Sequence, residues 1–346
     1  MDARVLSDKV PPLLKEDNNF DIIRYYLSLA VVLAHFSELS QTPKINFTSS
    51  YTAVGGFFIL SGFLVFYSFL RQPDLKAYIA RRVKRIFPPY MFIVVLCAFA
   101  GVFVSDYSFK EYFTSSQLYK YLAANCCFLN FLAPDLPGVF TGNHVKVVNG
   151  SLWTMKVELM LYASVPLVYW FFKRYNKLAV LIGIYVLSLV YRIVLGYMYN
   201  NSHNEIYMIF QRQVFGQFLF FYSGVFVLFY FDYFQQYIRY IFPAALLLVI
   251  TGGYNPVYTY IQPACLACVI LGFAYNCRWF VWMRKYDNIA YDIYLFHFPI
   301  IQLVVSLGLV RYNYWLALAV ILILTIGLSL FSWNRIEKPV LKSRHH

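Results

Sequence analysis

Charged side chains are scarce in this sequence. Asp, Glu, Lys and Arg make up 13% of the 346 residues, whereas a soluble globular domain usually carries about 25%. Hydrophobic residues account for 60%, aromatic residues for 21%, and the mean hydropathy is +0.57. This shortage of charge excludes an ordinary soluble protein and leaves no room for a separate soluble domain of usual size. We therefore expect an all-α, polytopic membrane protein, because helices satisfy their own backbone hydrogen bonds in lipid.

Cysteine is also sparse, with six residues and no spacing that indicates a disulfide framework. Cys265 and Cys268 form a CxxC, but no second Cys/His cluster accompanies it, so we expect no metal site. The first 19 residues are polar and contain Pro11-Pro12, which argues against a cleavable signal peptide. No internal repeat is visible, and this weakens the case for a transporter built from inverted repeats.

Apolar segments of the length that crosses a bilayer occur about ten times. We expect spans near residues 20–39, 53–70, 87–104, 152–172, 178–197, 210–230, 241–254, 257–276, 288–309 and 315–333, the seventh being short. Together they form a membrane domain over residues 20–340, between an N-terminal tail (1–19) and a C-terminal tail (341–346) that ends in a probable tag remnant, His345-His346.

The longest segment expected outside the membrane runs over residues 106–150. Its middle, Leu118–Leu132, is apolar enough to form a re-entrant helix. A long loop over a membrane bundle is a candidate lid or substrate platform.

Basic residues outnumber acidic residues by 29 to 16, for a net charge of +13. One set of alternate loops holds Arg71, Lys76, Arg81, Arg82, Lys84, Arg85, Lys173, Arg174, Lys177, Arg239, Arg278, Arg284 and Lys285. The opposite loops hold only Lys44, Lys110, Lys120, Lys146 and Arg311. This positive-inside bias predicts that both termini are cytoplasmic. Membrane topology therefore explains the net positive charge of the chain, and we expect no nucleic-acid partner.

Polar residues follow one face of the first predicted span. Arg24 and His35 are eleven residues apart, which places them on the same face of a helix and roughly 16 Å apart along its axis. Asp21, Ser28 and Glu38 fall on the same stripe. Because a cation and an imidazole are costly inside a membrane, this stripe favours a functional site over packing.

Two further segments place charge beside the membrane. Arg82 and Arg85 are three residues apart before the third span, and a guanidinium fork suits phosphate oxygens, although a positive-inside anchor is the favoured explanation when this segment is taken without the other motifs. Lys156 and Glu158 lie in the first turns of the fourth span. For Lys156 an interfacial ion pair, snorkelling and a site role all stay open, whereas a site role is favoured for Glu158.

Later spans add four more candidates. His297 lies within the ninth span, either at a site or in an interhelical hydrogen bond. Glu337 closes the tenth span, where it can pair with a nearby basic residue. Arg192 and Arg212 border the fifth and sixth spans and are candidates for the substrate side, although snorkelling is the commoner explanation.

Six of these segments, in this order, resemble the acyltransferase-3 family of integral membrane acyltransferases, and the resemblance covers essentially the whole chain. They are Asp21-x-x-Arg24 with His35 after a ten-residue gap, Gly56-Phe-Phe-Ile-Leu-Ser-Gly-Phe63, Arg82-x-x-Arg85-Ile-x-Pro88, Ser151-Leu-Trp-Thr-Met-Lys-Val-Glu158, Tyr294-Leu-Phe-His297 and Glu337-Lys-Pro339.

The resemblance implies an O-acetyltransferase of the bacterial cytoplasmic (inner) membrane. Such an enzyme moves an acetyl group from cytoplasmic acetyl-CoA to a hydroxyl of an extracytoplasmic glycan, such as lipopolysaccharide O-antigen or exopolysaccharide. Some members carry an extra SGNH hydrolase-like domain, which we do not expect here because the sequence stops soon after the tenth span. The implied partners are acetyl-CoA, a glycan acceptor and membrane lipid.

The resemblance also implies roles for the polar residues. His35 is the expected general base, because imidazole titrates near neutral pH, with Glu158 as the first candidate to orient it and Glu38 as the second. Arg82 and Arg85 are expected to bind the CoA phosphates, with Arg24 holding the donor along its path. Further candidate site residues are Asp21, Ser61, Tyr90, Trp153, Lys156 and His297.

Several alternatives stay open at the level of sequence. A transporter or flippase of lipid-linked saccharides without acyl transfer is the main one, and a non-catalytic scaffold is a weaker one. Within the enzyme hypothesis, the acyl group can be succinyl, the acceptor a small molecule, and the transfer direct or through an acyl-enzyme. The sequence gives neither the sugar and its hydroxyl nor the oligomeric state.

Overall fold

A computed structural model describes residues 18–45, 48–254, 257–277 and 279–342. Every regular element in these ranges is helical and no β-strand occurs among them, with one isolated bridge between Ser105 and Val139. The all-α prediction is therefore confirmed. The predicted tails fall largely outside the described residues (1–17 and 343–346), as does Arg278.

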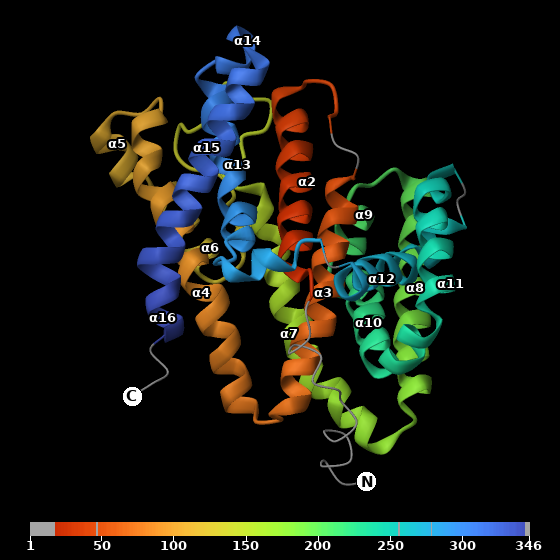
Figure 1. The fold of residues 1–346 in the computed structure, drawn as a ribbon. Helices are drawn as coiled ribbons and strands as arrows, with labels where there is room; N and C mark the ends of the chain where they lie inside the picture. Colours follow the sequence, from red (N-terminus) through yellow and green to blue (C-terminus); the bar gives the residue numbers. More distant parts are fainter. Residues whose placement is uncertain (1–17, 46–47, 255–256, 278, 343–346) are drawn as a thin grey trace. The chain divides into compact units, whose positions relative to one another are not determined.

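Nine helical segments of the described chain are long and apolar enough to cross a membrane (Figure 1). Their bounds are Phe20–Ser40, Ser50–Arg71, Leu75–Val104, Gly150–Arg174, Lys177–Ser202, Ile206–Phe229, Phe231–Thr251, Tyr258–Asn276 and Tyr314–Lys342. The remaining predicted span, 288–309, is a shorter apolar helix of 17 residues, Ala290–Ser306. A polytopic helical membrane protein is thus confirmed.

The seventh helix is longer than its apolar run. The sequence predicts a short span over 241–254, whereas the helix begins at Phe231. Asp232 and Arg239 interrupt the hydropathy of this first half, but both are exposed, so they project from the helix without ending it. Hydropathy alone cannot detect such an extension, because it does not register which face carries the charge.

The chain divides into two compact units. Unit 1 comprises Met1–Ile23, Tyr51–Tyr78 and Val157–Tyr286. It contains α3 (Ser50–Arg71), most of α7 (Trp153–Arg174), α8 (Lys177–Ser202), α9 (Ile206–Gln211), α10 (Val214–Phe229), α11 (Phe231–Thr251), α12 (Tyr258–Asn276), and the short helices η4 (Gly252–Tyr254) and η5 (Val281–Lys285). Within it, α10 packs against α8 and α12, and α12 also packs against α11.

Two glycines let α3 and α10 approach at backbone distance. A Cβ on Gly62 would overlap the carbonyl oxygen of Phe221, and a Cβ on Gly224 would overlap that of Ile59. Small residues at helix crossings give this close packing in membrane proteins. Gly62 of the Gly56–Phe63 motif therefore serves helix packing in unit 1.

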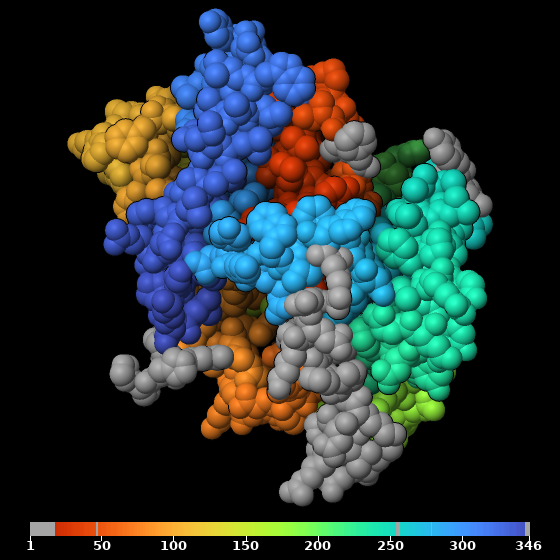
Figure 2. Space-filling model, in the orientation of Figure 1, coloured from red at the N-terminus to blue at the C-terminus, as the bar shows by residue number. Residues whose placement is uncertain are grey.

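Unit 2 comprises Arg24–Ser50, Ile79–Lys156 and Asp287–His346. It contains most of α2 (Phe20–Ser40) and α4 (Leu75–Ala100), α5 (Phe109–Thr114), α6 (Ser116–Cys126), α13 (Ala290–Ser306), α14 (Leu309–Tyr312), α15 (Tyr314–Ser332), α16 (Lys338–Lys342), and the short η1 (Gly101–Val104), η2 (Asn130–Leu132), η3 (Gly150–Leu152) and η6 (Trp333–Glu337). α13 packs along α15, and Figure 2 shows α15 and α16 in blue on the visible face of this unit.

Helices α2 and α13 of unit 2 lie side by side and run parallel. Near their starts, the Tyr25 hydroxyl donates to the carbonyl of Asp287 (3.1 Å) and accepts from the backbone N–H of Ile289 (3.2 Å). About ten residues further along both helices, His35 meets His297. The expected topology requires the first and ninth spans to run in one direction, as they do here, while the cytoplasmic placement of the termini stays a prediction.

Candidate active site

Two histidines from α2 and α13 meet inside unit 2. Nδ1 of His35 lies 2.8 Å from Nε2 of His297, and the ring planes are 9° apart with centroids separated by 5.1 Å. The other nitrogen of His297, Nδ1, lies 3.1 Å from the carbonyl oxygen of Ile293. The Phe298 ring packs edge-on against His35 at 5.3 Å. His297 is fully buried and His35 is half-buried, so one imidazole supports a more accessible one.

This hydrogen-bond chain fixes the tautomers of the neutral pair. A carbonyl oxygen only accepts, so Nδ1 of His297 carries a proton and its Nε2 carries a lone pair. That Nε2 accepts from Nδ1–H of His35. Nε2 of His35 is then the unprotonated nitrogen of the pair, the form that a general base requires. Glu38, the second candidate to orient His35, is exposed on α2.

The segment before α7 also reaches α13 beside the histidines. The Tyr294 hydroxyl lies 2.8 Å from Oγ1 of Thr154, and Nδ2 of Asn149 donates to the carbonyl of Leu295 at 2.9 Å. The Tyr294 ring lies 6.0 Å from that of His297. The Ser151–Glu158 and Tyr294–His297 motifs, far apart in sequence, thus adjoin through these contacts.

The long segment over residues 106–150, called the outer segment below after its expected place, also contacts α13 on the C-terminal side of His297. Gln302, which is fully buried, donates through Nε2 to the carbonyls of Val145 (2.6 Å) and Val147 (2.8 Å) and accepts from Asn143 (2.9 Å). Since Asn149 reaches the same helix at Leu295, this segment brackets the turn that carries His297.

The third and sixth motifs form an ion pair. Nη1 of Arg85 lies 2.7 Å from Oε2 of Glu337, whose side chain is fully buried. Glu337 ends η6, a π-helical turn between α15 and α16, and such turns are frequent at functional sites. The rings of Tyr291 and Trp333 lie 5.4 and 5.5 Å from the guanidinium of Arg85. The expected pairing of Glu337 with a basic residue is therefore observed.

The predicted donor-side cations gather at one end of unit 2. Lys338 follows Glu337 and pairs with Asp287 at 2.6 Å, and this contact lowers the pKa of the Asp287 carboxyl. The backbone carbonyl of Asp287 also accepts a hydrogen bond from the hydroxyl of Tyr25, the residue after Arg24. Arg24 and Arg85 therefore lie toward the same end, and Arg24 is eleven residues of α2, or roughly 16 Å, from His35.

The other predicted residues of unit 2 have packing contacts. Tyr90 is fully buried and stacks on Phe128, with centroids 4.1 Å apart. Nζ of Lys156 lies 4.4 Å from the centre of the Phe131 ring. Trp153 is half-buried and begins α7. Arg82 lies one turn before Arg85 on α4 and is half-buried.

Three predicted site residues belong to unit 1. Glu158 is half-buried on α7 and accepts a hydrogen bond from the Tyr162 hydroxyl. Asp21 and Ser61 are half-buried on α2 and α3. The partner that the structure gives to Nδ1 of His35 is His297, and the orienting role of Glu158 stays a prediction.

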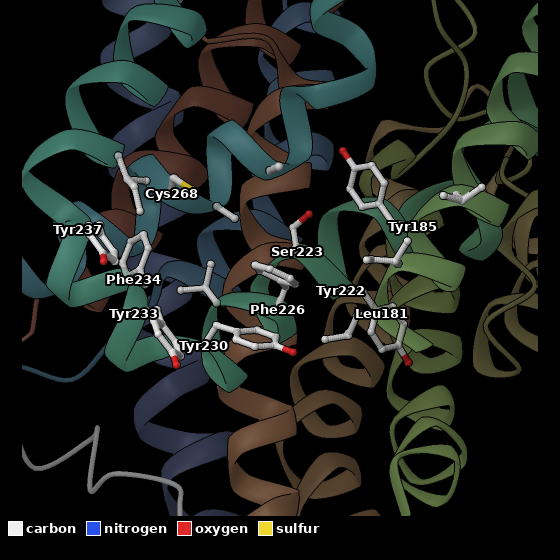
Figure 3. Close-up of a pocket in the computed structure, with 16 residues that line it drawn as sticks. Leu181, Tyr185, Tyr222, Ser223, Phe226, Tyr230, Tyr233, Phe234, Tyr237 and Cys268 are labelled. Atoms are coloured by element: carbon white, nitrogen blue, oxygen red, sulfur yellow. The ribbon is translucent and has the colours of Figure 1, made fainter. Parts of the chain in front are cut away.

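A pocket of about 470 Å³ lies in unit 1 between α8, α10, α11 and α12 (Figure 3). Its labelled lining residues include Tyr185, Tyr222, Ser223, Tyr230, Tyr233, Tyr237 and Cys268. No charged residue and no histidine line it, so it offers no base for proton transfer. In the described ranges no group of three or more His, Cys, Asp or Glu could hold a metal ion, and all six cysteines are free thiols.

Comparison with known proteins agrees with the motifs. A family model described as an acyltransferase domain, acyltransferase-3, matches residues 17–333. Nodulation protein 10 of Rhizobium leguminosarum bv. viciae is 25% identical over 362 residues, covering 94% of each chain. The O-acetyl transferase of Shigella phage Sf6 is 30% identical over 156 residues, 43% of this chain and 45% of the phage protein. No solved structure matches this chain.

Proposed function

The chain belongs to the acyltransferase-3 family, and from this premise we propose that it is a membrane O-acetyltransferase that transfers acetyl groups from cytoplasmic acetyl-CoA to a hydroxyl of an extracytoplasmic glycan. Family membership makes it an acyltransferase, and the nine long apolar helices among its described residues make it a multi-pass membrane protein. The acetyl group, the CoA donor, the glycan acceptor and the bacterial inner membrane belong to the proposal. The phage relative, which is named an O-acetyl transferase, supports the acetyl group and the oxygen acceptor.

The histidine pair carries the proposed mechanism. His35 accepts the proton of the acceptor hydroxyl at Nε2 while the hydroxyl oxygen forms a bond to the acyl carbon. When the carbon–sulfur bond breaks, His35 returns this proton to the leaving thiolate. His297 accepts from Nδ1 of His35 throughout, which holds the ring in place and stabilises the imidazolium while it exists. Atoms balance without a covalent enzyme intermediate.

Arg24, Arg82 and Arg85 are the residues proposed to hold the phosphates of the donor. Their place toward one end of unit 2 supports this role, because a donor bound there through its phosphates can extend its arm along α2 toward His35. The Arg85 side chain is 32% exposed, so its ion pair with Glu337 leaves part of the guanidinium accessible. That pair also fixes the direction of the side chain, which favours a defined phosphate geometry.

The outer segment is proposed to position the acceptor. Its contacts to α13 at Leu295 and Gln302 place it beside the turn of His297, so a glycan resting on it would be close to the base. Lipopolysaccharide O-antigen and exopolysaccharide are the proposed acceptor classes.

The experiment is transfer of label from radiolabelled acetyl-CoA to cell-envelope glycan by the purified protein in nanodiscs. We expect label on an oxygen of the glycan with the unmodified protein and none with His35→Ala, with equal insertion and thermal stability of both. Near-normal transfer by His35→Ala would refute the assignment of the base. A protein that carries saccharide across the bilayer and consumes no acetyl-CoA would refute the proposed activity.

A further inference from the structure

A second cationic centre lies in unit 1, apart from the proposed donor residues. Arg192 on α8 is only 8% exposed, although a snorkelling arginine would place its charge at the surface. Its guanidinium lies 5.5 Å from the centre of the Tyr51 ring on α3 and 5.8 Å from that of Phe220 on α10, and these two rings meet edge-on with their centres 5.7 Å apart (Figure 1 shows the three helices). Arg212, in the turn between α9 and α10, adds a second positive charge that acts on Tyr51.

This centre contains buried hydrogen-bond donors without acceptors. Among the described residues, Nη1 of Arg192 and the hydroxyl of Tyr51 are buried without a hydrogen-bond partner, and no carboxylate pairs with Arg192. The side chains of Arg192 and Gln217 lie near the Tyr51 oxygen as further donors, outside strict hydrogen-bond geometry, so neither offers an acceptor for the Tyr51 O–H, and Gln217 is itself 1% exposed. Unmatched donors buried together are expensive and call for a specific cause.

The surrounding structure holds these donors in place. Nε2 of Gln211 donates to the backbone carbonyl of Arg192 at 2.9 Å, which ties α9 to α8. Nε2 of Gln217 donates to the carbonyl of Arg212 at 3.3 Å. A Cβ on Gly55 would lie 2.6 Å from the Phe220 ring, so this glycine provides the space in which that ring backs the guanidinium.

We propose that Arg192 and Tyr51, with Arg212 beside them, bind an oxyanion, either a phosphate monoester or a carboxylate. A guanidinium and a phenol hydroxyl both donate, and an anionic oxygen is the acceptor that satisfies both and cancels the buried charge. If the chain acts on glycans as proposed above, this anion belongs to the acceptor, as the phosphate of its lipid carrier or the carboxylate of an acidic sugar. That last assignment rests on the proposed function, whereas the anion site does not.

The test is binding of defined probes to the full chain in detergent, without an acetylation readout. Inorganic phosphate, farnesyl phosphate and glucuronate carry the anion, and farnesol and glucose are the matched neutral controls. We expect at least one anionic probe to bind and its neutral counterpart to bind far more weakly. Binding by farnesyl phosphate alone assigns the site to a lipid-carrier phosphate, and binding by glucuronate alone assigns it to an acidic sugar.

Substitutions separate a binding site from a structural role. Tyr51→Phe removes a buried hydroxyl that has no acceptor in the free protein, and Arg192→Gln removes a buried charge that no carboxylate of the described residues pairs, so thermal stability without ligand should be unchanged or higher. Binding of the anionic probe should weaken about tenfold in Tyr51→Phe and about 100-fold in Arg192→Gln, which also removes the charge. Tyr197→Phe and Arg239→Gln, both at exposed positions, are the matched controls.

Equal probe affinity in the unmodified protein and Arg192→Gln would overturn the proposal, as would binding of no anionic probe. If Arg192→Gln does not fold, Tyr51→Phe and Arg192→Lys decide the matter in the same way, since Lys keeps the charge and loses the fork. His35→Ala must bind the probe normally. A failed acetylation experiment with normal anion binding would therefore count against the proposed function alone.

Discussion

Replacement of His297 tests whether the second histidine acts on the reaction or only fills space. His297 has no proposed contact with either substrate, and its Nε2 accepts from Nδ1 of His35 at 2.8 Å. In His297→Ala this Nδ1–H loses its acceptor, and the preference for the tautomer with a free Nε2 is lost with it. His297→Gln supplies a carbonyl oxygen that can accept the same proton.

The expected loss follows from the charge that His35 gains during the reaction. With both rings neutral, the hydrogen bond contributes about 1 kcal/mol, and when His35 holds the acceptor proton the donor is charged and the contribution is about 1.5–3 kcal/mol. The difference, about 0.5–2 kcal/mol, slows the chemical step roughly 2- to 30-fold, and the loss of the tautomer preference adds to this. The effect should stay below that of His35→Ala, which removes the base itself and with it a factor of about 100 to 10,000.

Steady-state acetyl transfer in nanodiscs measures this effect. We expect kcat to fall in His297→Ala and to recover in part in His297→Gln. The KM for acetyl-CoA should stay constant, because the proposed phosphate contacts lie toward the far end of α2. His203→Asn, at an exposed left-handed position after α8, is the matched control and should keep full activity. An unchanged kcat in a folded His297→Ala protein, or a changed KM alone, would refute the reasoning.

Three further predictions concern stability. Arg85→Gln leaves the buried Glu337 carboxyl without its cationic partner and should lower the free energy of unfolding by about 3–5 kcal/mol. The double variant Arg85→Gln, Glu337→Gln should regain most of this stability. Equal melting temperatures of the single and double variants would contradict the ion pair. Gly62→Ala should destabilise the protein by about 1–3 kcal/mol because the added Cβ overlaps a backbone carbonyl of α10. Gly327→Ala is the control: it has open space around it, so its melting temperature in the same thermal scan should be unchanged or higher. The pKa of Asp287 is lowered in the folded state by its pairing with Lys338. This exposed ion pair therefore stabilises the protein by at most about 1 kcal/mol at pH values above the unfolded Asp pKa of about 3.9, and this stabilisation is lost as pH falls through the folded pKa. The melting temperatures of Asp287→Asn and the unmodified protein should differ at pH 7 and converge at acid pH.

The separate polar positions were predictable from sequence, because each interrupts an apolar run at a cost. His35 and His297 both stand out in this way, and so does Glu337 at the end of the last helix. The pairings were not predictable. His35 and His297 are 262 residues apart, and no periodicity within one helix shows which face of another helix it contacts.

Arg192 shows the same limit in a sharper form. An arginine near the end of a span snorkels to the interface in most cases, and from the sequence snorkelling is the favoured explanation for Arg192. Its burial depends on rings from α3 and α10, which only tertiary packing brings to α8. Its neighbour in the prediction, Arg212, is exposed as snorkelling requires. Two similar residues thus differ because of helix packing rather than local sequence.

The use of a second imidazole in place of a carboxylate suits a site inside a membrane. A carboxylate that oriented His35 would place a permanent charge among apolar helices and would need its own compensation. A neutral imidazole accepts the same hydrogen bond and adds no charge in the resting state. Its own Nδ1–H is satisfied by the carbonyl of Ile293, one turn earlier on α13. We infer that charge arises in this pair only while His35 holds the acceptor proton, so the cost of a buried ion is confined to the chemical step.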